Sequence, residues 1–169
     1  MRKYIIIFLL FTTINALAQD KVTVASVKQL FQKSKDIFQN GRFVYPTDKT
    51  WLFENNKDSL YFKRDTLVGI FHKSGKRKNL CESVSWTFHK KNEFVIHRES
   101  MCKEPPSIST LKFPDDYFSI AIYKVEHEIM IDVLSRNDKM IMESFKVVSL
   151  EIKKDFNKIV LQRRFNPYE

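Results

Sequence analysis

Glycine is scarce in this chain of 169 residues, which contains three Gly and five Pro. That composition excludes collagen-like and low-complexity proteins. Motifs that carry familiar enzyme chemistry are also missing: the chain has no Gly-rich phosphate loop, no Gly-x-Ser-x-Gly elbow, no His-Glu-x-x-His and no Cys-x-x-Cys. We therefore expect a protein that is not an enzyme, with no catalytic residues, no cofactor and no metal site. An enzyme stays as a third and weaker alternative, because no nucleophile and base are paired in the sequence.

Long apolar runs are confined to the N-terminus. A basic pair at positions 2–3 precedes an apolar stretch over residues 4–17, and small residues stand at Ala16 and Ala18. This order is typical of a secretory signal peptide, and polar interruptions make the stretch a poor membrane anchor, which is the alternative. We predict cleavage after Ala18, export to the periplasm or the extracellular space, and no membrane span in the remaining residues 19–169.

The charge balance is basic. The chain has 29 Lys and Arg against 20 Asp and Glu, and loss of Arg2 and Lys3 with the signal lowers the net charge from +9 to +7. Fifteen Phe, six Tyr and two Trp supply large apolar side chains. The length and this composition predict one globular domain over residues 19–169.

Apolar residues near the new N-terminus recur with helical spacing. They are Val27, Leu30, Phe31, Ile37 and Phe38. Ser26 stands where an N-cap is expected, and Gly41 stands where a helix would end. We predict one amphipathic helix over about residues 26–40, which covers the fold behind it.

After Gly41 the apolar period changes to two, which is typical of half-buried strands. Short runs of this kind extend from about residue 50 to 165: Trp51–Glu54, Ser59–Lys63, Thr66–His72, Cys81–His89, Phe94–Cys102, Tyr117–Val125, Glu128–Leu134, Met140–Ile152 and Lys158–Phe165. Short polar turns separate them. The pattern predicts a mainly β fold, an antiparallel meander of eight or nine strands that is closed or nearly closed into a barrel, because closure removes sheet edges.

Two hairpins have a register that can be predicted from their turns. A turn at residues 91–92 places His89 opposite Phe94 and Trp86 opposite His97. A turn at residues 126–127 gives the second hairpin one continuous apolar face, formed by Phe118, Ile120, Ile122, Ile129, Ile131 and Val133. We expect this apolar face to point into the barrel.

The two cysteines are expected to pair. The register of the first hairpin, carried outward, places Cys81 opposite Cys102, which is within the range of a disulfide. Export gives a second and independent reason, because cysteines of exported proteins are usually oxidised. Two reduced, buried thiols are the alternative.

The strand pattern resembles that of lipocalin-like domains in small secreted Bacteroidetes proteins, over roughly residues 50–164. The resemblance rests on a signal that ends in Ala-Leu-Ala-Gln and on the segments 50–53 (Thr-Trp-Leu-Phe), 85–88 (Ser-Trp-Thr-Phe), 117–120 (Tyr-Phe-Ser-Ile), 145–150 (Phe-Lys-Val-Val-Ser-Leu) and 158–164 (Lys-Ile-Val-Leu-Gln-Arg-Arg). It implies an up-and-down β-barrel with a small hydrophobic ligand in its interior.

A candidate ligand pocket follows from the two hairpins and this resemblance. Its residues are Trp86, Phe88, Val95, His97, Glu99, Phe118, Ile120, Ile122 and Ile131. His97 and Glu99 would be its polar groups in an apolar lining, as in many small-molecule sites. A histidine satisfied by its neighbour at a sheet edge is the more ordinary interpretation. The first hypothesis for function is therefore a non-catalytic exported protein that binds a small hydrophobic or amphiphilic ligand.

The densest charge run lies between two predicted strands and contains Lys73, Lys76, Arg77 and Lys78. Such a loop fits an anionic envelope component or an acidic protein partner, although a solvated hairpin tip is the more common case. Nucleic acid is not expected, because no aromatic residues are interleaved with these charges. The second hypothesis is an envelope protein-interaction module, such as an inhibitor, an immunity-type protein or an assembly factor, with a solid barrel.

Overall fold

The computed structural model describes residues 22–32, 38–40, 43–45, 50–55, 61–74, 80–102, 104–105, 107–108 and 115–165. The predicted signal peptide, residues 1–18, lies outside the described residues. So do Lys76, Arg77 and Lys78 of the predicted basic loop. No helix within the described ranges is long and apolar enough to cross a membrane.

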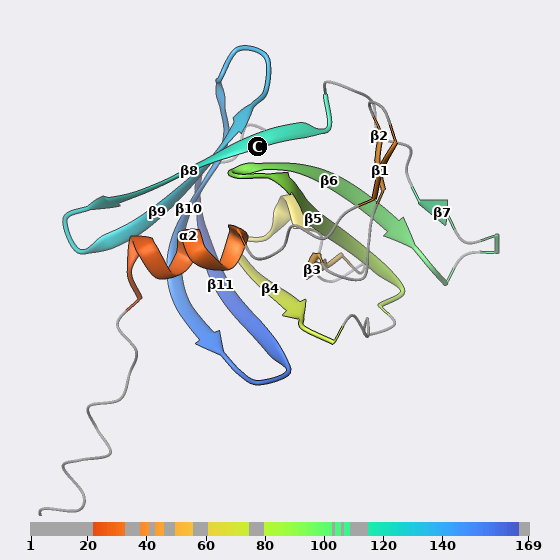
Figure 1. Cartoon of the computed structure of the whole chain (residues 1–169), viewed down its shortest axis with the longest axis horizontal. Coiled ribbons are helices and arrows are strands. Elements are labelled where there is room, and N and C mark those ends of the chain that lie inside the picture. Colours follow the sequence, from red (N-terminus) through yellow and green to blue (C-terminus); the bar gives the residue numbers. More distant parts are fainter. Residues whose placement is uncertain are drawn as a thin grey trace, which may run out of the picture.

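Eight strands of the described chain form a closed antiparallel β-barrel, which confirms the predicted fold class (Figure 1). They are β3 (Trp51–Glu54), β4 (Thr66–His72), β5 (Glu82–Lys90), β6 (Glu93–Ser100), β8 (Tyr117–Val125), β9 (Glu128–Ser135), β10 (Ile141–Ile152) and β11 (Phe156–Phe165). The order around the wall is β5-β3-β4-β11-β10-β9-β8-β6, and pairing of β5 with β6 closes it. β7 (Ser107–Ile108) extends the sheet beside β6, and β1 (Phe38–Asn40) pairs with β2 (Phe43–Tyr45) in a separate small sheet.

The strand order departs from a simple meander at one place. β3 lies between β4 and β5, so that β4 pairs with β3 on one side and with the last strand, β11, on the other. Every pairing remains antiparallel. The first and last strands of the barrel, β3 and β11, therefore meet through β4 and not directly.

The predicted strand over Ser59–Lys63 is wrong in its described part, where a 3₁₀ turn, η1 (Tyr61–Lys63), is found instead. The backbone of this segment bonds to side chains and not to a neighbouring strand. Tyr61 N donates to Asn55 Oδ1 at 2.9 Å, and Arg163 donates to the Tyr61 carbonyl at 2.7 Å. These side-chain contacts hold Tyr61 in a compact turn at one end of the barrel.

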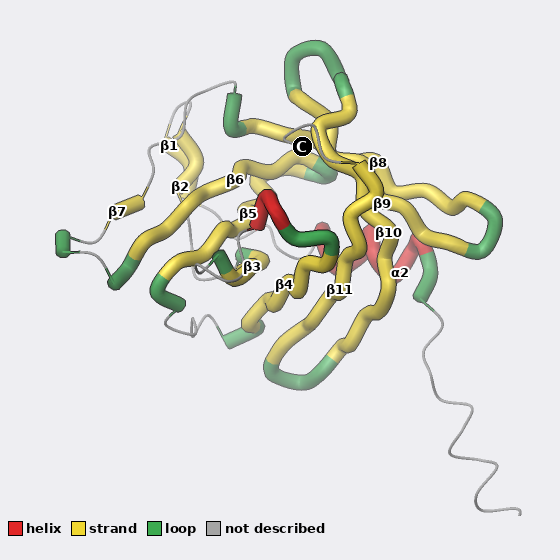
Figure 2. The backbone as a smooth tube through the Cα atoms, turned by 180° about the vertical axis from the view of Figure 1, so that it is seen from behind, coloured by secondary structure: helices red, strands yellow, loops and turns green. Residues whose placement is uncertain are grey.

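A short helix, α2 (Val24–Gln32), lies at the other end of the barrel, as the front and back views together show (Figures 1 and 2). The predicted helix over residues 26–40 was wrong at both ends, because Thr23 is the N-cap and residues 38–40 belong to β1. Thr23 and Ser26 form a reciprocal pair of side-chain to backbone hydrogen bonds, each at 3.0 Å. The helix buries Val27, Leu30 and Phe31 against the barrel.

The register predicted for the β5–β6 hairpin is wrong by one residue. Phe88 lies opposite Phe94, and Trp86 lies opposite Ile96, because a β-bulge interrupts the pairing between Phe88 and Lys90. The extra residue is His89. A shift of one residue places a side chain on the other face of the sheet, so Trp86 does not share a face with its predicted neighbour His97.

The disulfide between Cys81 and Cys102 is confirmed, with 4.8 Å between the two Cα atoms. The bulge shifts the register here too, and Met101 N donates to the Cys81 carbonyl at 2.7 Å. Cys81 therefore lies opposite Met101, and the bridge joins it to the next residue, Cys102, just beyond the last paired residues of the hairpin.

The second hairpin has its predicted register, with Ile122 opposite Ile131. Glu126 adopts a positive φ of 51° in the tight turn, and Asn92 does the same at 62° in the first hairpin. Ile122 and Ile131 are both buried in the hydrophobic core, so the apolar face points inward as expected.

Candidate functional site

The barrel interior was the predicted ligand site, and aromatic rings meet across it. The ring centroids of Trp86 on β5 and Phe145 on β10 are 6.1 Å apart. These two strands lie on opposite walls, since four pairings separate them in either direction around the barrel. Both side chains are fully buried. Direct contact between side chains therefore spans the interior from wall to wall.

Trp86 is the centre of this aromatic cluster. Its ring also meets Phe94 at 4.7 Å, Phe53 at 4.9 Å and Phe31 at 6.3 Å between centroids. Phe31 comes from α2, so the helix contributes a ring to the aromatic cluster. Aromatic pairs at these distances each contribute roughly 0.5–1.5 kcal/mol beyond their burial. The cluster is thus a strongly cohesive part of the core.

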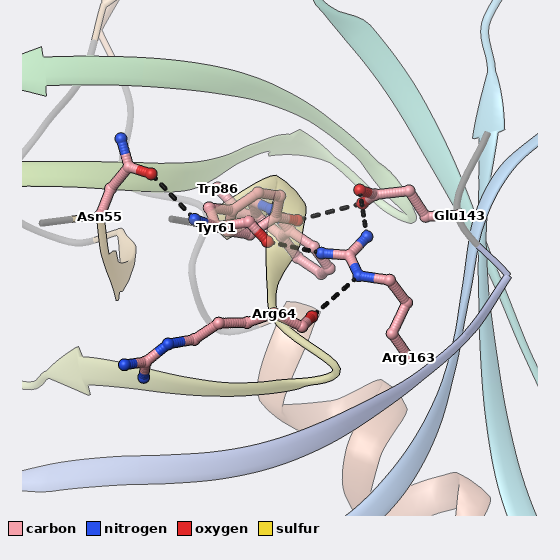
Figure 3. Close-up of polar contacts among 6 residues, drawn as sticks. All are labelled: Asn55, Tyr61, Arg64, Trp86, Glu143 and Arg163. Carbon is pink, nitrogen blue, oxygen red and sulfur yellow. Dashed lines mark hydrogen bonds and ion pairs between the residues drawn. The ribbon is translucent and has the colours of Figure 1, made fainter. Parts of the chain in front are cut away.

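A buried polar network connects Trp86 of the aromatic cluster, through Tyr61 and Glu143, to Arg163 (Figure 3). Trp86 Nε1 donates to the Tyr61 hydroxyl at 3.1 Å, and this hydroxyl donates to Glu143 Oε2 at 3.1 Å. Arg163 Nη1 forms a charged hydrogen bond with Glu143 Oε1 at 2.5 Å. Four side chains from η1, β5, β10 and β11 are therefore connected inside the barrel.

Arg163 uses the rest of its guanidinium to hold the segment around η1. Nη2 donates to the Tyr61 carbonyl at 2.7 Å, and Nε donates to the Arg64 carbonyl at 3.1 Å. The guanidinium carbon lies 4.9 Å from the ring centroid of Phe145. The fixed planar fork of arginine can satisfy several acceptors at once, which lysine cannot do.

Burial sets the protonation of this network. Desolvation raises the pKa of Glu143, and the neighbouring Arg163 opposes that shift. The pKa of Tyr61 lies well above 10, mainly because the phenol is completely buried and next because of Glu143. Tyr61 therefore stays neutral and acts as a hydrogen-bond donor. Both oxygens of Glu143 and the Tyr61 hydroxyl are engaged within the network, which supports a structural role.

The structure separates the predicted pocket residues into two groups. The interior group consists of Trp86, Phe88, Ile120, Ile122 and Ile131, with Phe118 partly buried beside it. The second group consists of Val95, His97 and Glu99, which lie opposite Thr87, Ser85 and Ser83, respectively. These residues alternate with the inward-facing Trp86 and Phe88, so they lie on the outer face of the β5–β6 hairpin. The two predicted polar groups of the pocket therefore do not enter the barrel.

The outer face of β5 and β6 is itself buried. His97 and Glu99 have little exposed surface, and Ser85 Oγ donates to Glu99 Oε1 at 3.3 Å. Thr50 extends this polar layer, because its hydroxyl donates to the Trp86 carbonyl at 2.7 Å and lies 3.0 Å from the Thr87 hydroxyl. The layer is a covered part of the fold and not an open surface.

The sequence interpretation missed Tyr61, Glu143 and Arg163. A signal for two of them was present, because they interrupt the inward-facing alternation of their strands. Glu143 precedes Phe145 and Val147 on one face of β10, and Arg163 follows Ile159 and Leu161 on one face of β11. Opposite charges at inward positions of two adjacent strands predict a buried ion pair.

The start of the basic loop lies against the β10–β11 turn. Lys73 N donates to the Asp155 carbonyl at 2.9 Å, and Lys73 Nζ donates to the Lys153 carbonyl. The turn adds Lys153 and Lys154, both exposed. Two basic segments that are far apart in the sequence thus share one end of the barrel.

The fold and its interior define a closed eight-stranded β-barrel whose aromatic rings meet along its centre. Within the described ranges, no three His, Cys, Asp or Glu side chains gather closely enough to hold a metal ion. Comparison of the chain with protein-family models, with curated proteins and with solved structures finds no match.

Proposed function

We propose that this protein is a non-catalytic interaction module, in which a solid β-barrel is a rigid scaffold and the outer surface binds a protein partner. The contact between Trp86 and Phe145 across the barrel carries the proposal. An eight-stranded barrel has room either for its own side chains or for one small ligand. A ligand between these rings would have to separate them and break the hydrogen bond from Trp86 to Tyr61.

A small hydrophobic ligand in the interior is the competing function. It is implied by the resemblance to lipocalin-like domains, and the closed eight-stranded barrel supports that resemblance as a proposal. The position of β3 between β4 and β5 departs from an up-and-down order. The separation of His97 and Glu99 from the interior removes the polar groups that the pocket needed. The solid barrel is therefore the better supported of the two.

We place this module outside the cytosol, in the periplasm or the extracellular space. The disulfide between Cys81 and Cys102 supports an oxidising compartment. The N-terminal sequence, with its basic pair and its apolar stretch up to Ala18, supports the same location.

Native mass spectrometry of the protein, secreted with its own N-terminal segment, tests the proposal. The expected spectrum contains the mass of residues 19–169 with one disulfide and with no small-molecule adduct. A lipid or other amphiphile bound in a one-to-one ratio, and released by organic solvent, would overturn the solid barrel and restore the ligand hypothesis. The same spectrum reports whether the chain begins after Ala18.

A further inference from the structure

Strand β10 is paired over more of its length on one side than on the other. β10 pairs with β11 up to Ile152, but it pairs with β9 only from Ile141 to Lys146. Among the described residues, the segment Val147–Ile152 therefore has a strand on one side only. A free strand edge of this length presents backbone N–H and C=O groups to which another chain can pair.

The side chains of this segment favour such pairing. Its sequence, Val-Val-Ser-Leu-Glu-Ile, combines high β-propensity with one charge and has no Pro or Lys. Val148 is 52% exposed and Ile152 is 55% exposed, among the most exposed large apolar residues of the described chain. A β-bulge between Val147 and Ser149 is the one protective feature that the pairing shows.

The charges around the free edge are mainly positive. Five lysines lie on β10, on its neighbour β11 and around the turn that joins them: Lys73, Lys146, Lys153, Lys154 and Lys158. Glu151 forms exposed ion pairs with Lys153 and Lys158. Glu128 of β9 pairs with Lys146 and with Arg164 of β11, and Asp155 is the third acidic residue of the region, so six basic side chains stand against three acidic ones. The excess of positive charge favours an acidic partner and disfavours a basic one.

We propose that the free edge Val147–Ile152 binds an extended segment of a partner protein by β-strand addition, and that this segment has an apolar centre with acidic residues on either side. The backbone would supply the pairing, Val148 and Ile152 would contact the apolar centre, and the lysines would contact the acidic flanks. The inference deepens the proposed function, because it names the surface and the chemistry of the partner.

A second copy of the same chain is a less suitable occupant. Antiparallel edge-to-edge pairing of two copies would place the turn lysines of each copy, Lys153 and Lys154, near Lys146 of the other copy. Residues 19–169 carry a net charge of +7, so two copies would also repel each other at longer range. Charge complementarity therefore selects a different, acidic protein.

A synthetic peptide tests this proposal directly. The probe has a Val-Thr-Val-Thr-Val core with two Asp on each side, and the control probe has Lys in place of each Asp. We expect the acidic probe to slow amide hydrogen exchange in Val147–Ile152, and the basic probe to leave it unchanged. Equal effects of the two probes, or no protection of this segment by the acidic probe at millimolar concentration, would overturn the proposal.

Matched variants distinguish binding at the β10 edge from non-specific binding to exposed apolar residues. The double variant Val148→Ser, Ile152→Ser should weaken binding of the acidic probe at least about fivefold, because apolar contact is lost. Val68→Ser is the control, since Val68 is 41% exposed on β4, which lies between β3 and β11. An equal loss in both variants would contradict the assignment to the β10 edge.

Analytical ultracentrifugation without any probe tests whether a second copy of the chain binds the free edge. The proposal expects a monomer. A dimer that the Val148→Ser, Ile152→Ser variant abolishes would assign the edge to a second copy and overturn the acidic partner. None of these three experiments depends on what the barrel interior holds, so their failure is distinguishable from failure of the solid-barrel proposal.

Discussion

The indole ring of Trp86 and the phenyl ring of Phe145 lie 6.1 Å apart, although they belong to strands on opposite walls of the barrel. The proposed function rests on this contact: if the aromatic rings fill the interior, the outer surface is what remains for binding other molecules.

The packing of the interior predicts a large effect of Phe145→Ala. Removal of a fully buried phenyl ring should lower the free energy of unfolding by about 3–5 kcal/mol, because a cavity replaces its contacts. Urea unfolding measures this change. Phe165→Ala is the matched control, because Phe165 is 48% exposed and its loss should cost less than about 0.5 kcal/mol.

The buried ion pair predicts a non-additive mutant cycle. Arg163→Met leaves Glu143 without its charged partner and should cost about 3–5 kcal/mol of stability. The double variant Arg163→Met, Glu143→Leu should recover part of that loss, since it removes both charges. Additive losses in urea unfolding would show that the two side chains act independently. Lys158→Met, which removes an exposed contact with Glu151, should cost about 0–1 kcal/mol.

His89 at the bulge predicts a loss of stability in mild acid. Burial lowers the pKa of His89 from 6.5, against the opposing effect of Glu93. The unfolded chain therefore takes up the proton first as the pH falls, so the contribution present above pH 6.5 is lost on acidification. The free energy of unfolding should fall less steeply below neutral pH in His89→Phe than in the unaltered protein.

The disulfide predicts a redox-dependent stability. The bridge joins cysteines separated by 21 positions, and its removal should lower the free energy of unfolding by about 3 kcal/mol. A Cys81→Ala, Cys102→Ala variant and the reduced protein should have the same midpoint in urea. Dithiothreitol should have no effect on that variant, and a further loss there would mean that reduction acts elsewhere.

Periodicity predicted the strands well because a barrel wall alternates between buried and outward positions. β3, β4 and β8 begin and end at the predicted residues; β4 shows the alternation most clearly, whereas the first three residues of β3 are all buried. The register of β5–β6 could not be predicted, since nothing in the sequence around His89 distinguishes a bulged residue from a paired one. That one residue moved His97 and Glu99 out of the predicted pocket.

The predicted end of the helix and the predicted strand at Tyr61 were wrong for other reasons. Phe38 continues a helical spacing in the sequence, but it belongs to β1, so a local period was overridden by pairing with β2. Tyr61 was assigned to a strand because it has high β-propensity, whereas its backbone is held by the distant side chain of Arg163. A contact between residues so far apart in the chain has no local signature.

Intrinsic fluorescence tests the solid barrel most directly. The chain has two tryptophans, Trp51 and Trp86, and both are fully buried in the core, so their emission reports on the barrel interior. Titration with fatty acids and with small aromatic molecules should leave the emission of the unaltered protein unchanged. The Phe145→Ala variant should bind small aromatic molecules in its new cavity, which verifies that binding would be seen. Saturable quenching of the unaltered protein at a one-to-one ratio would contradict the account.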